Sequence, residues 1–464
     1  MGAILFIIIS VLIYLVKILH NSRNLTHEKW IEIFTSFFVF VNCTGFGLPL
    51  FDLGINQSNG AFGTTFRLEV YMLLFPVFLI TLSQRNKWKM MPIPWYVVMC
   101  IILFCGVNLF NPANLSIQSS IIAIAQLLCY AIFLYFLCSC ASIQTIFNGI
   151  YEGFVYTTIV EVILCICFPI LGITQVVELF RAGTSIRAEE RPGAPGTFTH
   201  PNSMGGYMSY ITTFFTTCYI LGIRKRKSLI FTLLAAFALL LTFSRTALVA
   251  CIIAVITIIT ILKTYKGRIF TIKNIFTILL PLIILAAALV FLTPIKDSFI
   301  GSNMDEMMVA RLLHFYCGYE TIIEYPWLGV GLNAHLEYIR HNISFGETFG
   351  DLNRIFWQAE EFMFTHPIHN ILLIFLTEFG FLGTLPIIYF IVRRFTKIKT
   401  ILRNDYTSIE KFFFLYSIGL ICCVGIHGMA DWAPLSSQLR NVWVMIFFIT
   451  ATHQLSPATK KSKH

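Results

Sequence analysis

The stretch THPIHNILLIFLTEFGFLG, Thr365 to Gly383, places two histidines directly before an apolar run. An apolar run that crosses hydrocarbon as a helix needs about 20 residues, and this stretch opens such a run. His366 and His369 would then stand at the mouth of a membrane span, where polar side chains are costly unless something needs them. The stretch therefore predicts a membrane helix with a functional site at its first turn.

The rest of the chain repeats the apolar pattern. Its 464 residues are 57% hydrophobic and only 12% charged, and the mean hydropathy is +0.77. Soluble domains are about 25% charged. The apolar blocks are continuous rather than alternating, which favours helices over a transmembrane barrel. We therefore expect an all-α, polytopic transmembrane helical bundle.

About 12–13 spans are expected, and the connection 294–368 is long enough to carry short helices of its own. The spans are placed near 3–19, 30–50, 67–84, 92–110, 117–139, 146–173, 203–222, 228–243, 246–263, 274–293, 369–392, 409–429 and 436–453. With the N-terminus outside, most of the 33 Lys and Arg residues fall in cytoplasmic loops. This predicts a multi-pass membrane protein with 294–368 outside, and no role for the net charge in nucleic-acid binding.

The basic residues expected on the outer side are almost all arginine. They are Arg67, Arg181, Arg187, Arg191, Arg245, Lys296, Arg311, Arg340, Arg354 and Arg440. Arginine offers a planar fork of donors that fits phosphate. Most histidines fall on this side too, which favours a site for an anionic, lipid-linked substrate. The alternative is that long outer loops simply hold more residues of every type.

Two arginines lie in the connections that lead into expected spans. Arg191 precedes PGAPGTFTHPNSMGGYM, an irregular loop in which Asn202 or Ser203 would cap the following helix and present its N–H groups to an anion. Arg245 sits in LLTFSRTALVACI, between two apolar blocks, at or just above hydrocarbon depth. A plain turn before a span, or a snorkelling arginine, remains the structural alternative at each place.

Two further motifs carry histidine. In ARLLHFYCGYETIIEYPWLGVGLNAH, Arg311 and His314 fall at helical spacing, and the glycine-rich PWLGVGLN ends that helix. His366 and His369 share a face if their segment is helical, and Asn370 would cap or orient. A neutral imidazole there is able to take a proton from a sugar hydroxyl. Metal binding and a purely structural histidine are the alternatives, although no third ligand is suitably spaced.

The thirteen cysteines fall almost entirely inside apolar blocks. Cys317 alone lies well within the long connection. Buried free cysteine behaves as a small hydrophobic residue, so we expect free thiols rather than a disulfide framework. There is no CxxC pair to suggest a metal.

Taken in order, the four motifs resemble the O-antigen ligase and Wzy-type polysaccharide polymerase family. The ligase pattern of His, Asn, nine residues, Gly, two residues and Gly is met by His369, Asn370, Gly380 and Gly383. The resemblance covers roughly 190–390. It implies N-terminal transmembrane helices over 1–189, a ligase/polymerase-like core over 190–393 and C-terminal transmembrane helices with a basic tail over 394–464.

The resemblance also implies an activity. Family members are membrane glycosyltransferases that move a glycan from undecaprenyl diphosphate to an acceptor sugar on the outer side, without a metal or other cofactor. The candidate catalytic residues are therefore His369, Arg245 and Arg311; the candidate substrate-binding residues are Arg191, His366, Asn370, Asn202 and His314. The expected partners are the donor, a glycan or lipid-core acceptor, membrane lipids and other polysaccharide-assembly proteins.

Ligation and polymerisation remain open, because they share this chemistry and differ only in acceptor. The paired Arg-x₁₀-Gly loops described in this superfamily are absent around Arg181, Arg187, Arg191, Arg340 and Arg354. A lipid-linked oligosaccharide flippase is the alternative from another class. It predicts charges along a central cavity and pseudo-repeated halves, neither of which is evident.

Overall fold

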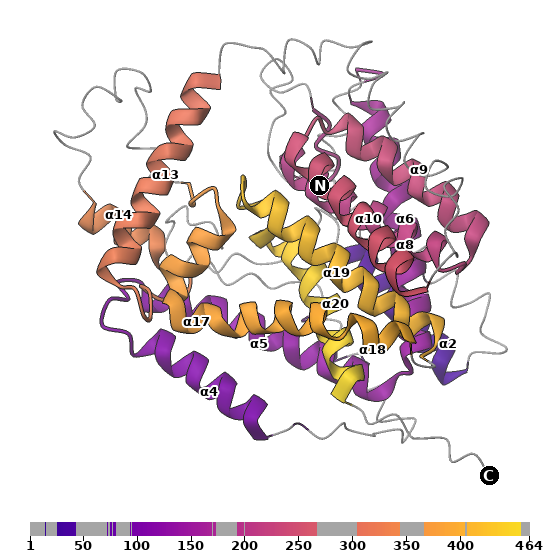
Figure 1. Ribbon diagram of the computed structural model, residues 1–464, viewed down its shortest axis with the longest axis horizontal. Coiled ribbons are helices and arrows are strands. Elements are labelled where there is room, and N and C mark those ends of the chain that lie inside the picture. The colour runs from indigo at the N-terminus through magenta and orange to yellow at the C-terminus, as the bar shows by residue number, and fades with distance from the viewer. Residues whose placement is uncertain are drawn as a thin grey trace.

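The computed structural model of the protein describes residues 14, 26–42, 72, 75–76, 78–79, 93, 95–168, 170–172, 193–198, 200–266, 304–343, 366–403 and 406–455. Over these ranges the chain is helical and contains no strand, which confirms the predicted all-α fold (Figure 1). The spans expected near 3–19 and 274–293, and most of the span near 67–84, lie outside the described residues.

The helices follow the predicted spans closely. They are α2 (His27–Asn42), α4 (Trp95–Leu109), α5 (Ile117–Cys140), α6 (Ile143–Cys167), α8 (Pro201–Ile220), α9 (Lys225–Leu241), α10 (Arg245–Lys266), α13 (Met304–Glu324), α14 (His335–Asn342), α17 (Ile371–Thr396), α18 (Ile398–Arg403), α19 (Ser408–Gly428), the 3₁₀ turn η3 (Ala433–Leu435) and α20 (Ser437–Leu455). Within the described part of the connection 294–368, α13 and α14 are the expected extra helices.

Five of these helices are long and apolar enough to cross a membrane. They are Ile117–Cys140, Ile143–Cys167, Arg245–Thr264, Ile371–Thr396 and Ser408–Gly428. A shorter apolar stretch, Leu439–Thr452, lies in α20. The protein is therefore a multi-pass helical membrane protein.

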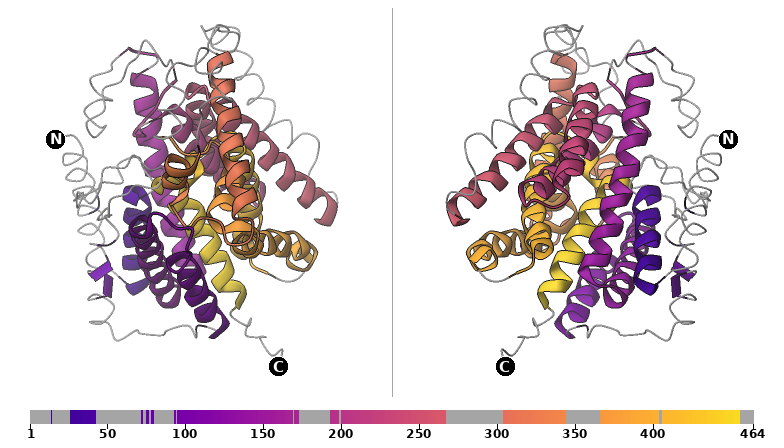
Figure 2. Two further views of the ribbon diagram at one scale, coloured as in Figure 1. Left: turned by 90° about the vertical axis from the view of Figure 1, so that its left-hand side faces the viewer. Right: turned by 90° about the vertical axis from the view of Figure 1, so that its right-hand side faces the viewer.

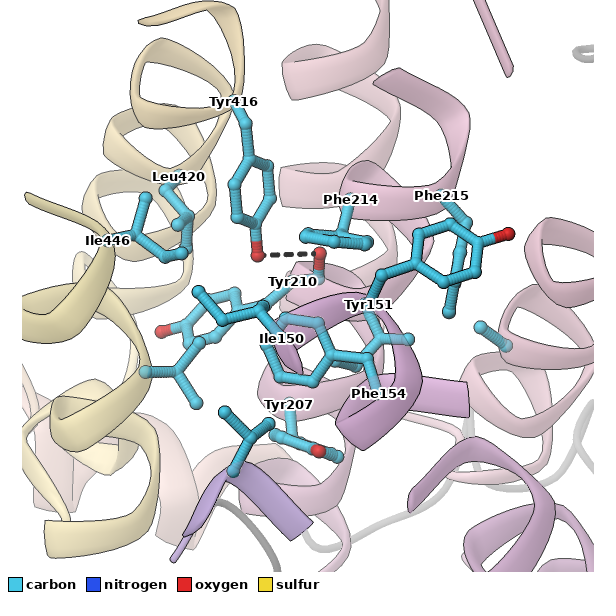
Figure 3. Close-up of a cluster of buried hydrophobic side chains, with 14 of the residues drawn as sticks. Ile150, Tyr151, Phe154, Tyr207, Tyr210, Phe214, Phe215, Tyr416, Leu420 and Ile446 are labelled. Atoms are coloured by element: carbon cyan, nitrogen blue, oxygen red, sulfur yellow. Dashed lines mark hydrogen bonds between the residues drawn. The ribbon is translucent and has the colours of Figure 1, made fainter. Parts of the chain in front are cut away.

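An aromatic core joins α6, α8 and α19 (Figure 3). Phe214 of α8 makes edge-to-face contacts with Phe154 of α6 at 4.9 Å and with Tyr416 of α19 at 5.2 Å between ring centroids. The Tyr416 hydroxyl donates to the Tyr210 carbonyl at 3.2 Å. Aromatic rings bury large areas in defined geometries, so this core fixes the relative positions of the three helices.

Gly380 interrupts α17 with a φ of 62°, a left-handed conformation that glycine adopts without strain. A Cβ at Gly380 would stand 2.4 Å from the Trp327 carbonyl carbon. The break leaves four backbone groups for the turn that follows α13. Val330 N and Gly331 N donate to Thr377 O (2.8 Å) and Glu378 O (2.9 Å), while Phe381 N and Leu382 N donate to Pro326 O (2.8 Å) and Trp327 O (3.1 Å).

The docked turn holds α13 and α14 against the first half of α17, at the edge of the bundle (Figures 1 and 2). The last turn of α4 and the loop that follows it fasten the same turn from the other side. Asn111 Nδ2 donates to Gly329 O at 2.7 Å, and Leu332 N donates to Asn108 Oδ1 at 2.7 Å. Because buried backbone groups need partners, these bonds place the turn and therefore α13.

Candidate active site

His369 of the segment before α17 faces His314 of α13. Their Nδ1 atoms are 3.0 Å apart, and the rings stack with centroids 4.7 Å apart at 13°. His314 is buried, whereas His369 is half-buried. Residues 366–370 are not helical, so His366 is exposed and does not share a helix face with His369. The tertiary structure instead pairs the histidines of two separate sequence motifs.

The hydrogen bonds of His369 assign its tautomer. Its Nδ1 lies 3.0 Å from the Pro367 carbonyl oxygen, which only accepts hydrogen bonds. Nδ1 of the neutral ring therefore carries the hydrogen, and this nitrogen also faces Nδ1 of His314. This arrangement leaves Nε2 as the basic nitrogen of His369, the state that a general base requires.

Burial shifts both histidines toward the neutral form. Burial lowers the pKa of His314 well below its ordinary value, and the charges of His369 and His366 lower it further. Burial also lowers the pKa of His369, where the charge of Asp431 acts in the opposite direction. A lowered pKa keeps both rings neutral near pH 7.

Asn370 caps α17 as the sequence predicts. Its Oδ1 accepts from Leu372 N at 3.0 Å and from Leu373 N at 3.1 Å, which satisfies two N–H groups of the first turn. Its Nδ2 donates to the Met429 carbonyl at 3.1 Å. Asn370 therefore ties the helix that follows His369 to the end of α19.

Asp431, directly after α19, lies between histidines of two elements. Its Oδ1 accepts from Ala433 N at 3.0 Å, and its Oδ2 accepts from Asn202 Nδ2 at 2.8 Å. Burial raises the pKa of Asp431, but the charges of His427 and His369 and these hydrogen bonds outweigh burial, and its pKa is lowered. The carboxylate is thus ionised and stabilises positive charge on the neighbouring imidazoles.

The cap of α8 differs from the prediction. His200 is the N-cap, with its Nδ1 accepting from Asn202 N at 3.0 Å, and Pro201 occupies the first turn. Proline suits this position because it lacks the N–H that would need a partner. The Asn202 side chain is thereby available to Asp431 rather than to its own helix.

Of the three arginines predicted to bind the diphosphate, the structure describes two. Arg245 is the first residue of α10, and Arg311 belongs to α13; both side chains are exposed. The charge of Arg311 contributes to the lowered pKa of His369, which puts its guanidinium within electrostatic range of the imidazole. Arg191 lies outside the described residues.

The segment that follows Arg191 is nevertheless fixed, by a carboxylate inside the bundle. Glu161 of α6 is fully buried, and its Oε2 accepts from Thr197 N at 2.9 Å. Its other oxygen accepts from the Thr197 hydroxyl. Ala194 N donates to Leu241 O at 2.8 Å, which fastens the segment to the end of α9. Residues 193–198 therefore pack beside the turn that leads to Arg245.

Sequence reasoning missed Asp431, and it did not single out the pair of His335 and Glu378. His335 Nδ1 lies 2.6 Å from Glu378 Oε1, and each side chain is only 1% exposed. A lone carboxylate inside an apolar span is the signal for Glu378. Asp431 follows a span within MADWAPL, and its acidic side chain between apolar residues is the comparable signal.

Residues 230–388 match the model of a family described as O-antigen ligase. No curated protein matches the chain. The matched region contains Arg245, Arg311, His314 and His369, whereas Asp431 lies beyond it. O-antigen ligases are inner-membrane proteins that act on a lipid-linked glycan donor and an acceptor, so the match supports membrane glycosyl transfer in polysaccharide assembly. The match confirms the predicted resemblance to the O-antigen ligase family over residues 230–388 of the chain.

Proposed function

We propose that the protein transfers a glycan from undecaprenyl diphosphate to an acceptor sugar hydroxyl on the outer face of the membrane. The observation that carries this proposal is the environment of His369. Its Nδ1 lies 3.0 Å from the Pro367 carbonyl oxygen, an acceptor, and therefore carries the hydrogen, so that Nε2 is the basic nitrogen of the ring. Arg311 brings a permanent cation to the same region.

His369 acts as general base in this scheme. Nε2 takes the proton of the acceptor hydroxyl as its oxygen attacks the anomeric carbon of the donor. The imidazolium that forms keeps its Nδ1 hydrogen bond to the Pro367 carbonyl, and the Asp431 carboxylate stabilises its positive charge. A base in this position contributes roughly 10²–10⁴-fold to the rate.

The arginines stabilise the leaving group. When the bond between the anomeric carbon and the diphosphate oxygen breaks, its electron pair stays on that oxygen. Arg311 and Arg245, together with Arg191, are assigned to this developing charge because guanidinium donors fit phosphate oxygens. A single displacement of this kind inverts the anomeric carbon.

Purified protein in detergent, given a polyprenyl-diphosphate oligosaccharide and an acceptor glycan, tests the proposal. We expect release of polyprenyl diphosphate and a lengthened acceptor, both lost in His369→Ala. Retained activity in His369→Ala would reject His369 as the base. Movement of intact donor between leaflets, without release of diphosphate, would support the flippase instead. An acceptor series of lipid core and repeat-unit glycans separates ligation from polymerisation.

The arginine and metal assignments have their own tests. Arg245→Lys should lose nearly as much activity as Arg245→Ala, because lysine keeps the charge but not the fork of donors. Full activity in the lysine variant would show that charge alone suffices. Activity should also persist in a chelator, and strong inhibition would favour a metal.

A further inference from the structure

Arg394 lies in the last turn of α17 and is almost entirely inside the protein. Only 3% of its surface is exposed, although its neighbour Arg393 is exposed. The guanidinium carbon lies 4.5 Å from the centre of the Phe390 ring, and that ring packs against Phe447 of α20 at 5.2 Å. The guanidinium is thus held against an aromatic contact between two helices.

The Nη1 atom of Arg394 is buried and has no hydrogen-bond partner in the part of the chain that the structure describes. A guanidinium cannot shed its proton, so burial leaves a charge that requires an acceptor. The helix dipole favours cations in a last turn and accounts for Arg393. It does not account for an arginine that is buried and whose Nη1 has no acceptor among the described residues.

The surroundings of Arg394 are positive. Lys397 follows one turn later and is half-buried. Burial lowers the pKa of Lys397, and the charges of Arg393 and Arg394 lower it further. Among the described residues, no carboxylate forms an ion pair with any of these three cations. Within the described part of the chain, no ion pair therefore balances the positive charge of this cluster.

The cluster lies where a membrane span ends. The candidate span formed by α17 ends at Thr396, and α18 turns back so that Ile398 and Leu402 pack in a cluster with α10 and α19. Beside Arg394, Val392 and Phe395 remain exposed, at 52% and 40%. Phosphate groups of phospholipids lie at this level of a bilayer, with acyl chains directly beneath them.

We propose that Arg394, with Lys397, binds the phosphate of an anionic phospholipid at the end of α17 opposite to His369. The guanidinium supplies a fork of donors for phosphate oxygens, and Lys397 adds a point charge. Val392 and Phe395 offer apolar surface to the acyl chains of the same lipid. The basic residues of the sequence predict the cytoplasmic leaflet for this end.

The adjacent arginines provide a matched test. Full-length wild type, Arg394→Gln and Arg393→Gln are purified in detergent, saturated with phosphatidylglycerol, washed and compared by native mass spectrometry. Wild type should retain phosphatidylglycerol in preference to phosphatidylcholine. Loss of one charge-assisted phosphate contact should reduce retention by roughly tenfold in Arg394→Gln, whereas Arg393→Gln should stay within about twofold of wild type. Should Arg394→Gln fail to fold, Arg394→Lys, which keeps the charge, should reduce retention by about threefold.

Several results would overturn the proposal. Equal retention by wild type and by the folded Arg394 variant removes the site. Equal losses in the Arg393 and Arg394 variants indicate general surface attraction instead. Thermal unfolding in the presence of inorganic phosphate separates the two sources of phosphate. If inorganic phosphate protects wild type as well as phosphatidylglycerol does, the ligand is a free anion and the lipid assignment fails.

Discussion

Two histidine pairs along α17 show how the partner of an imidazole decides its use. His369 and His314 pair through their Nδ1 atoms, and His369 is only half-buried. His335 pairs with Glu378 at 2.6 Å, and both side chains are 1% exposed. In the first pair, Nε2 of His369 is the basic nitrogen, and the ring is partly exposed. The second is sealed inside the bundle, where a substrate does not reach it.

The backbone around each pair fits this difference. The backbone carbonyl of Glu378 also accepts a hydrogen bond from Gly331 N. His335 and Glu378 therefore lie where the turn after α13 packs against the break in α17. His369 precedes the helix and is steadied by Pro367 and by the cap at Asn370. We infer that one pair performs the proton transfer and the other holds the framework around it.

Removing each histidine should separate these roles. His369→Ala should lose roughly 10²–10⁴-fold in turnover, because no other group replaces the base. His335→Gln retains a hydrogen-bond donor for Glu378 and should lose less than about tenfold, as expected for a group remote from the proton transfer. Release of polyprenyl diphosphate by equal amounts of folded protein measures both. Equal losses of turnover in the two variants would contradict the assignment of different roles to the two pairs.

Of the two pairs, His335 and Glu378 should contribute more to the free energy of unfolding. Glu378→Ala leaves His335 buried without its acceptor and should cost about 3 kcal/mol, seen as a lower midpoint of thermal unfolding in detergent. The matched control is Glu320→Ala on α13, a half-buried carboxylate that should leave the midpoint nearly unchanged. A midpoint for Glu378→Ala equal to that of the control would show that the pair adds no stability.

The charge of Asp431 beside His369 should appear in the pH dependence of turnover. Asp431 raises the pKa of His369, while burial lowers it. Asp431→Asn should therefore lower that pKa and move the acid limb of the rate profile down by up to about one pH unit. Turnover at neutral pH should also fall, because the imidazolium loses a stabilising charge. An acid limb that moves upward would contradict the assignment of His369 as the titrating base.

The smallest effect is expected at the cap. Asn370→Ala should cost about 1 kcal/mol of stability, since Leu372 N and Leu373 N lose their acceptor. Asn370→Asp keeps an acceptor for the cap but loses the donor to Met429 O. If thermal unfolding is normal in Asn370→Asp while turnover falls, the tie to Met429 positions His369. If both variants lose the same stability and turnover, the effect of Asn370 comes from capping α17 alone.

The sequence predicts which residue types line the candidate site, but it does not predict which of them contact one another. Helical spacing predicts that Arg311 and His314 share a helix, and α13 confirms it. His366 and His369 would share a face only in a helix, and the helix begins only after Asn370, so they do not. The Asn202 cap is also wrong, since His200 takes that place. Local patterns locate these residues near helix ends, whereas long-range contacts choose among the possible partners.

The amino-acid sequence by itself determined that this is a helical membrane protein with arginine and histidine before its spans, because apolar length and charge placement act locally. Only the tertiary structure decided that His314 faces His369, that the charge of Asp431 acts on His369 and that Arg394 is buried. The physical reason is that these pairings join positions far apart in the chain. They depend on the break at Gly380 and on the packing of α8, α17 and α19, which no local pattern encodes.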